Sequence, residues 1–435
     1  MRKVVAFFRE RKRRRGRQRP RIDAAEERKD VLETLRAWFL NATLAFGIIA
    51  FGVAILAIVM ELVQNSITIE SFSVPPSFDE QGYTGRVLAL RLIDELSDMN
   101  RQAEAGVPRK SFTADWQREA IDLPVPEMNT NLHSIVSVIR HLIGVGEQSF
   151  TCEIVNAEGG KLRVRARLTG RVPFAREYAA GTSLDAVITD LAAHFCKQSQ
   201  PVVYAAYECR RPGDVAAKEC EDSIRTILST SDRIDAMWAL NFLGGRQKET
   251  DRKRAIDTYT VGIRFGCDNP PKETKTVCAY LLGNRGGLHL DDDPRAAVAD
   301  LKRAMALRPH DRGILFNLGV AYEHAHDIPR AVETYTAACD AAPKDVRALV
   351  SRGTLRLDLH EFDAALDDFN RAISINPTYS TAYLSRARVF QRRQKRDEAE
   401  KDFDMAVLLD PRSVAEVAVL RGIEVAQVSP LEMRP

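Results

Sequence analysis

Small and bulky residues recur at a constant interval along the C-terminal part of the chain. A proline marks each interval, with an alanine five residues before it and a bulky apolar residue eight residues before it. These positions are Pro309, Pro343, Pro377 and Pro411; Ala304, Ala338, Ala372 and Ala406; and Leu301, Tyr335, Phe369 and Phe403. A fixed period of about 34 residues predicts a solenoid of stacked repeats.

Each repeat is predicted to contain two helices. In the repeat that ends at Pro343, apolar residues fall at helical spacing through residues 314–322 and again through 329–338. Gly319 lies on the first helix and Tyr335 on the second. We therefore expect the two backbones to approach closely at the glycine, with the ring filling the space beside it. The proline ends the second helix because it cannot continue one.

These repeats resemble the tetratricopeptide repeat (TPR) family, in both the length of the period and its small and bulky positions. The resemblance is regular over residues 282–410. It implies a mainly α fold, a helical-hairpin solenoid over residues 201–411 that is degenerate to about residue 275 and regular after it. We expect four regular repeats, about two degenerate ones, and a capping helix over residues 412–428.

A different pattern occupies the first 60 residues of the chain. Residues 1–36 contain fourteen Lys and Arg against six Asp and Glu, most densely in residues 9–21, and we predict a disordered tail. Residues 37–60 carry no charge, and about 20 apolar residues are enough to span a bilayer. We therefore predict one transmembrane helix over residues 37–60. A buried core helix is the alternative, whereas a cleaved signal peptide would have a shorter apolar region.

The charge distribution predicts the orientation of this span. Because the arginines precede it, the N-terminus is expected in the cytosol and everything after Met60 outside it, in the periplasm if the cell is bacterial. The basic residues 9–21 are also suited to anionic lipid headgroups, at about 1 kcal/mol for each nearby Lys or Arg. A nucleic-acid arm is the alternative, but no aromatic residue is interleaved with the arginines to stack on bases.

Residues 66–200 have a mixed pattern that predicts a small α+β module of uncertain type. The expected strands cover residues 66–74, 149–155 and 161–168, and the expected helices 84–102, 130–143 and 183–197. In the last strand, apolar residues alternate with Arg163, Arg165 and Arg167, which predicts one buried and one cationic face. A solvated surface and an anion-binding surface both fit this cationic row.

The seven cysteines are too few for a disulfide scaffold. Two pairs lie eleven residues apart, Cys209 with Cys220 and Cys267 with Cys278, and either pair can close a bridge in an oxidising compartment. The second pair flanks a loop and is the better candidate. Buried free thiols that pack as small apolar residues are the alternative.

The chain contains none of the phosphate-loop, dinucleotide, zinc-protease, C-x-x-C or G-x-S-x-G motifs that announce an enzyme. We therefore expect no catalytic residue, no metal and no cofactor. An unrecognised ligand-binding or enzymatic activity in residues 66–200 is one alternative. A cytosol-facing signalling adaptor is another, if the membrane orientation is reversed.

Protein binding is the function that this organisation favours. The TPR resemblance implies that the first helix of each repeat lines a concave groove. The implied groove residues are Phe316, Val320, Glu323, Val350, Thr354, Leu357, Leu384, Arg388 and Gln391. They lack the Lys/Asn clamp that some TPR proteins use to hold a C-terminal carboxylate. The partly apolar groove suits a helix or an extended segment of another protein, although some of these residues could instead pack between repeats. We predict a membrane-tethered scaffold, acting in the cell envelope.

Overall fold

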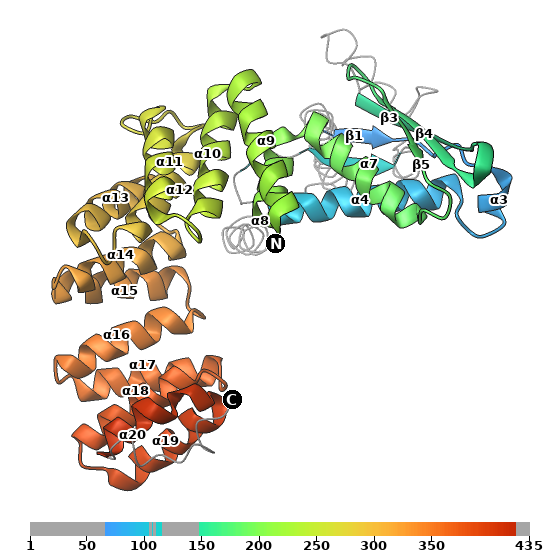
Figure 1. Cartoon of the computed structure of the whole chain (residues 1–435). Helices are drawn as coiled ribbons and strands as arrows, with labels where there is room; N and C mark the ends of the chain where they lie inside the picture. The colour runs from blue at the N-terminus through green and yellow to red at the C-terminus, as the bar shows by residue number, and fades with distance from the viewer. Residues whose placement is uncertain (1–65, 104–106, 108–109, 115–147, 423–435) are drawn as a thin grey trace, which may run out of the picture. The chain divides into compact units, whose positions relative to one another are not determined.

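A computed structural model of the 435-residue chain describes residues 66–103, 107, 110–114 and 148–422 (Figure 1). The predicted basic tail, the predicted transmembrane helix at 37–60 and the predicted helix at 130–143 lie outside the described residues. Among the helices that the structure does describe, none combines the length and the apolar character that a membrane span requires.

The chain divides into two compact units that interleave along the sequence. The first unit holds the strands β1 (Ser66–Ile69) and β2 (Ser111–Ala114) together with the start of β3 (Gln148–Asn156). Strand β1 lies between the other two and pairs with both in parallel. Its apolar side chains Ile67 and Ile69 are fully buried, so this short strand lies in the core of the unit.

The sheet continues through β4 (Leu162–Leu168) and β5 (Phe174–Tyr178) in the order β2-β1-β3-β4-β5. The 3-10 turn η1 (Glu158–Gly160) connects β3 to β4. Buried and exposed residues alternate along β4, so the predicted alternation is confirmed. The sequence pattern did not predict β2 or β5. Each is only four or five residues long, and in β5 only Phe174 is buried, so neither carries a periodic signal.

The second unit also contains helices outside the repeats. They include α3 (Pro76–Asp79), α4 (Gly85–Gln102) and α7 (Leu184–Ser199), and α4 packs against both α7 and α8 (Pro201–Arg210). Thr84 and Ser183 begin α4 and α7, because each hydroxyl accepts a hydrogen bond from the backbone N–H three residues later.

A mainly helical solenoid follows, as predicted, and residues 201–409 form six consecutive helix pairs (Figure 1). The first helices of the pairs are α8, α10 (Arg233–Gln247), α12 (Lys275–Leu288), α14 (Arg312–His324), α16 (Val346–Asp358) and α18 (Ser380–Arg392). The second helices are α9 (Asp214–Thr230), α11 (Arg252–Arg264), α13 (Pro294–Leu307), α15 (Ile328–Ala341), α17 (Phe362–Ile375) and α19 (Arg396–Leu409).

Small-to-large packing holds each regular pair together. A Cβ atom added to Gly319 would lie 2.5 Å from Cε1 of Tyr335, and one added to Gly353 would lie 2.7 Å from Cε1 of Phe369. Both rings are fully buried. The glycines therefore allow the helix backbones to approach to a distance at which any larger side chain would overlap the ring.

Buried ion pairs add a second link within three of the regular pairs. The guanidinium of Arg352 on α16 donates to Asp368 on α17 through Nη2 and Nε, at 2.6 and 3.0 Å. Arg386 and Asp402 form the same bidentate pair one repeat later, and Arg285 and Asp300 form it upstream. In the intervening repeat the equivalent positions hold an uncharged pair, Leu318 and Thr334.

Each of these arginines also reaches the preceding repeat. The third nitrogen donates to Thr260, Thr336 or Asn370, which lie on α11, α15 and α17, at 3.0, 3.2 and 2.7 Å. One guanidinium thus joins three helices. This arrangement satisfies most of its donors in a partly buried place, as an arginine requires there.

Two disulfides stabilise the earlier, less regular repeats. Cys209 is bonded to Cys220, and Cys267 is bonded to Cys278. The second is the pair that the flanking loop favoured, and the first was the other pair considered. The remaining cysteines, Cys152, Cys196 and Cys339, are buried free thiols.

The solenoid ends in the 3-10 turn η2 (Pro411–Ser413) and the helix α20 (Val414–Arg421). This helix is shorter than the capping helix expected over residues 412–428. It ends at Arg421 because Gly422 adopts a left-handed conformation, with φ of +75°, which stops a right-handed helix.

Candidate functional site

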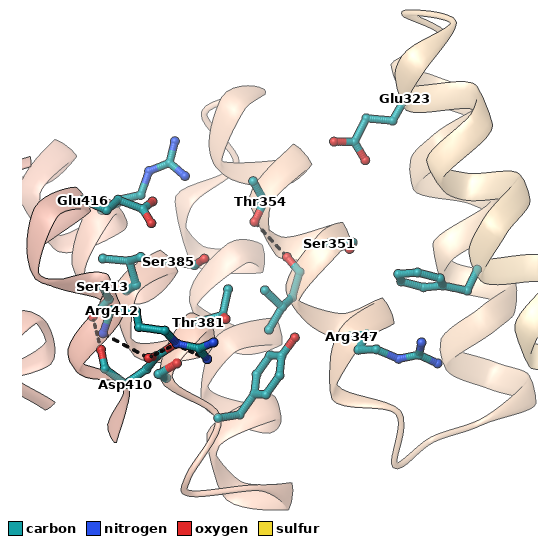
Figure 2. Close-up of a pocket in the computed structure, with 16 residues that line it drawn as sticks. Glu323, Arg347, Ser351, Thr354, Thr381, Ser385, Asp410, Arg412, Ser413 and Glu416 are labelled. Atoms are coloured by element: carbon teal, nitrogen blue, oxygen red, sulfur yellow. Dashed lines mark hydrogen bonds and ion pairs between the residues drawn. The ribbon is translucent and has the colours of Figure 1, made fainter. Parts of the chain in front are cut away.

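A cavity of about 670 Å³ lies along the first helices of the last three repeats, α14, α16 and α18. Residues of η2 and α20 complete its lining. Figure 2 shows Glu323 well apart from the group formed by Asp410, Arg412 and Glu416. The cavity is therefore elongated along the repeats rather than confined to one of them.

Six of the nine predicted groove residues line this cavity: Phe316, Glu323, Val350, Thr354, Leu384 and Arg388. The other three lie elsewhere. Leu357 is buried in the core, and Val320 packs against the apolar cluster around Tyr335. The amide of Gln391 donates to the carbonyl oxygen of Leu420, at 2.6 Å, and so fastens α18 to the terminal helix.

Three apolar side chains form a strip in the lining of the cavity. Phe316, Val350 and Leu384 occupy equivalent positions of successive repeats, on α14, α16 and α18. Val350 and Leu384 are mostly buried, whereas Phe316 is partly exposed. The guanidinium of Arg347 lies over the Phe316 ring, 4.7 Å from its centroid, and covers part of this strip.

Hydroxyl groups line the cavity above the strip. Those of Ser351 and Ser385 lie one repeat period apart, and Figure 2 also shows Thr381 and Ser413. Ser380 adds a further hydroxyl to the lining. The sequence analysis did not select these residues. Their recurrence at the repeat period was the available signal, but a serine carries too little apolar or charge contrast to stand out.

Most charged groups in the cavity already have a partner. The side chain of Arg347 forms a bidentate pair with Asp345, and that of Arg412 with Asp410. These guanidinium hydrogen bonds hold the pKa of both aspartates below the usual value. Glu323 accepts a hydrogen bond from the hydroxyl of Tyr335, at 3.0 Å.

Arg388 and Glu416 differ from the charged groups above. Within the part of the chain that the structure describes, neither has a hydrogen bond or an ion pair from its side chain. Arg388 is partly buried on α18, whereas Glu416 is exposed on α20. The cavity therefore offers a ligand one unpaired cation and one unpaired anion.

The lining consists of apolar, hydroxyl and charged side chains. In the described ranges, no three His, Cys, Asp or Glu side chains are grouped closely enough to hold a metal ion. The lining contains no histidine or cysteine beside its hydroxyls to activate one as a nucleophile. Shape, apolar contact and hydrogen bonding are what this cavity provides.

Comparison with known proteins supports the TPR family for the C-terminal repeats. A family model described as tetratricopeptide repeat matches residues 291–346 and 350–414, which include α14, α18 and most of α16. No curated protein matches the chain.

Several solved structures are similar to part of the chain. A crystal structure of MamA is 22% identical, with a TM-score of 0.35, and covers 39% of this chain and 96% of that one. MamA 41-end from Desulfovibrio magneticus RS-1 is 17% identical, with a TM-score of 0.36 and coverages of 42% and 98%. YrrB, titled a TPR protein with an unusual peptide-binding site, is 16% identical, with a TM-score of 0.37 and coverages of 46% and 96%.

Proposed function

We propose that this protein is a membrane-tethered scaffold that binds an extended segment or a helix of another protein along α14, α16 and α18. The observation that carries the proposal is the composition of the cavity: an apolar strip beside a row of hydroxyls, running across three repeats. A concave surface of this kind suits a polypeptide, because side chains contact the strip while hydroxyls bond to the peptide groups.

The hydroxyls favour a polypeptide for a specific reason. Serine and threonine both donate and accept hydrogen bonds, and so does every peptide group. Thr354 already donates to the carbonyl oxygen of Val350, at 2.9 Å, and keeps its acceptor lone pairs for a ligand N–H. The volume of about 670 Å³ accommodates a few residues of an extended chain rather than a folded domain.

The membrane tether and the compartment belong to the same proposal. The uncharged residues 37–60 behind a basic segment support a single span with the N-terminus in the cytosol. The two disulfides support an oxidising compartment for the repeats, because structural disulfides are rare in the cytosol. The function proposed is therefore docking of a partner protein at the outer side of a membrane.

A site-specific photo-crosslinker tests the groove. Placed at Thr354, inside the cavity, it should yield a crosslinked protein in living cells. Placed at Ala337, which is exposed on the second helix α15, it should yield much less. Equal crosslinking at both positions would show that the partner does not use this groove.

A topology assay tests the compartment. A periplasm-active phosphatase or a cytosol-active fluorescent protein would be fused after Pro435. Phosphatase activity is expected. Fluorescence without phosphatase activity would place the repeats in the cytosol and contradict the proposed orientation.

A further inference from the structure

Among the arginines that line the groove, only Arg388 lacks a partner in the described part of the chain. We infer that the bound segment carries an acidic side chain that pairs with Arg388, within two residues of an apolar side chain that contacts Leu384. This inference rests on the proposed function and adds the chemistry of the partner.

Three arginines of the same cavity differ in whether an acid neutralises them. Arg347 and Arg412 are each neutralised by an aspartate two residues away in the chain, through two hydrogen bonds. The residue two positions before Arg388 is Arg386, which is itself held by Asp402. Arg388 thus has no local acid, and its charge is available to a ligand.

Arg388 is also partly withdrawn from solvent. Arg388 is only partly exposed, so a ligand seated in the cavity would remove further water from its side chain. A carboxylate of the ligand would replace the hydrogen bonds to water that this side chain loses. The planar fork of arginine also matches the two oxygens of a carboxylate, which makes the pairing directional.

Arg388 lies close to the apolar strip. Arg388 follows Leu384 by one helical turn on α18, and both line the cavity. Side chains four residues apart on a helix lie about 6 Å apart, and two residues of an extended chain span about 6.6 Å. An acidic and an apolar side chain of the ligand can therefore meet both groups only if they are close in its sequence.

The equivalent positions of the other repeats indicate where along the groove the acidic side chain binds. Thr354 on α16 stands one repeat period before Arg388, lines the cavity and is uncharged. Val320, one period earlier on α14, packs against the apolar cluster around Tyr335 instead. Arg388 is thus the charged residue of this series, and the acidic residue is assigned to the α18 end.

An internal acidic side chain fits better than a C-terminal carboxylate. The cavity continues beyond α18 to Ser413 and Glu416, so a bound chain has room to run on. Glu416 carries an unpaired negative charge at that end, which favours a basic residue of the ligand after the acidic one.

An array of 12-residue peptides tests this inference with the full-length protein in lipid nanodiscs. The array would vary the charge next to an apolar residue, include each peptide with a free and an amidated C-terminus, and include overlapping segments of this chain. Wild-type protein should prefer an acidic residue by about tenfold or more, the size expected for a charge-assisted hydrogen bond. Amidation should leave the binding unchanged.

Variants assign the preference to one residue. Arg388→Glu should lose the acidic preference and gain a basic one, and Arg388→Gln should lose it without reversal. Arg396→Glu is the matched control, since Arg396 is exposed on the neighbouring helix α19 and does not line the cavity. It should behave as wild type. Melting curves for all three variants would verify that the repeats remain folded.

Each result that differs from these expectations has its own consequence. Peptide binding with no acidic preference, or one that Arg388→Glu leaves intact, would overturn the inference and leave the proposed function standing. Binding that amidation abolishes would assign the carboxylate to a chain terminus, and binding restricted to this chain's own segments would assign the groove to a second copy. Either would also overturn it. No binding to any peptide would contradict the proposed function itself.

Discussion

Removing the buried carboxylate of Asp368 should destabilise the solenoid strongly. This carboxylate accepts hydrogen bonds from Arg352 at 2.6 and 3.0 Å and from Arg356 at 2.8 Å. The side chains of Asp368 and Arg352 are only 4% and 10% exposed. The variant Asp368→Ala therefore leaves one guanidinium buried without its counter-ion and removes a partner from a second.

The expected cost follows from this burial. Breaking a buried ion pair on one side typically costs about 3–5 kcal/mol, because the remaining charge is neither paired nor hydrated. Arg356 should add little, since it is partly exposed and lies within 4.0 Å of Glu361. We expect Asp368→Ala to lower the free energy of unfolding by about 3–5 kcal/mol, measured by urea titration with far-ultraviolet circular dichroism.

The chain itself supplies a matched control. The preceding repeat has Leu318 and Thr334 at the positions of Arg352 and Asp368. The double variant Arg352→Leu/Asp368→Thr copies this uncharged pair and should remain within about 1–2 kcal/mol of wild type, since replacing both partners removes the unpaired charge. The reasoning would be refuted if Asp368→Ala cost less than the double variant.

Three other changes test the packing, the disulfide and the pH dependence. Gly319→Leu should lower the melting temperature by the equivalent of about 1–3 kcal/mol, since its Cβ alone would overlap the ring of Tyr335. The double variant Cys267→Ser/Cys278→Ser should lose about 2–4 kcal/mol of stability under oxidising conditions. Burial, with the nearby charge of Arg176, lowers the pKa of His194 in the folded state. Its neutral form therefore favours folding above the unfolded pKa of about 6.5, and stability should fall as the pH drops below that value. His194→Gln should remove this part of the pH dependence of the melting temperature.

Each of these variants has its own control. Gly283→Ala should be tolerated, because a Cβ there would lie 3.6 Å from Ile314, an ordinary contact. Cys339→Ser removes a free thiol and should not respond to oxidation in the way the disulfide variant does. Reductant should bring wild type and the disulfide variant closer together, and a constant difference between them would contradict the disulfide. A histidine variant with the wild-type pH profile would assign that profile to other groups.

Much of the solenoid was predictable because its defining contacts are periodic. Gly319 meets Tyr335 and Gly353 meets Phe369 at the same separation in sequence. The groove position of the apolar strip was implied by the resemblance to the TPR family. The tail and the membrane span rest on composition alone and stay predictions.

Other features could not be predicted because they depend on which elements meet. The short strand β5 has one buried residue, and its place beside β4 comes from the sheet rather than from a pattern of its own. The bond between Arg352 and Thr336 joins two repeats. In the sequence, these two residues are indistinguishable from surface residues.

The repeats and their paired helices could be predicted from the sequence, because they depend on contacts within one repeat period, and the TPR resemblance implied the groove face of each first helix. Which charges neutralise one another depends on the folded structure. Arg352 and Arg386 are bound by aspartates of the neighbouring helix, whereas Arg388 has no such partner in the described chain. All three lie on first helices, and the difference arises because a charge is paired only where folding brings an acid within hydrogen-bonding distance.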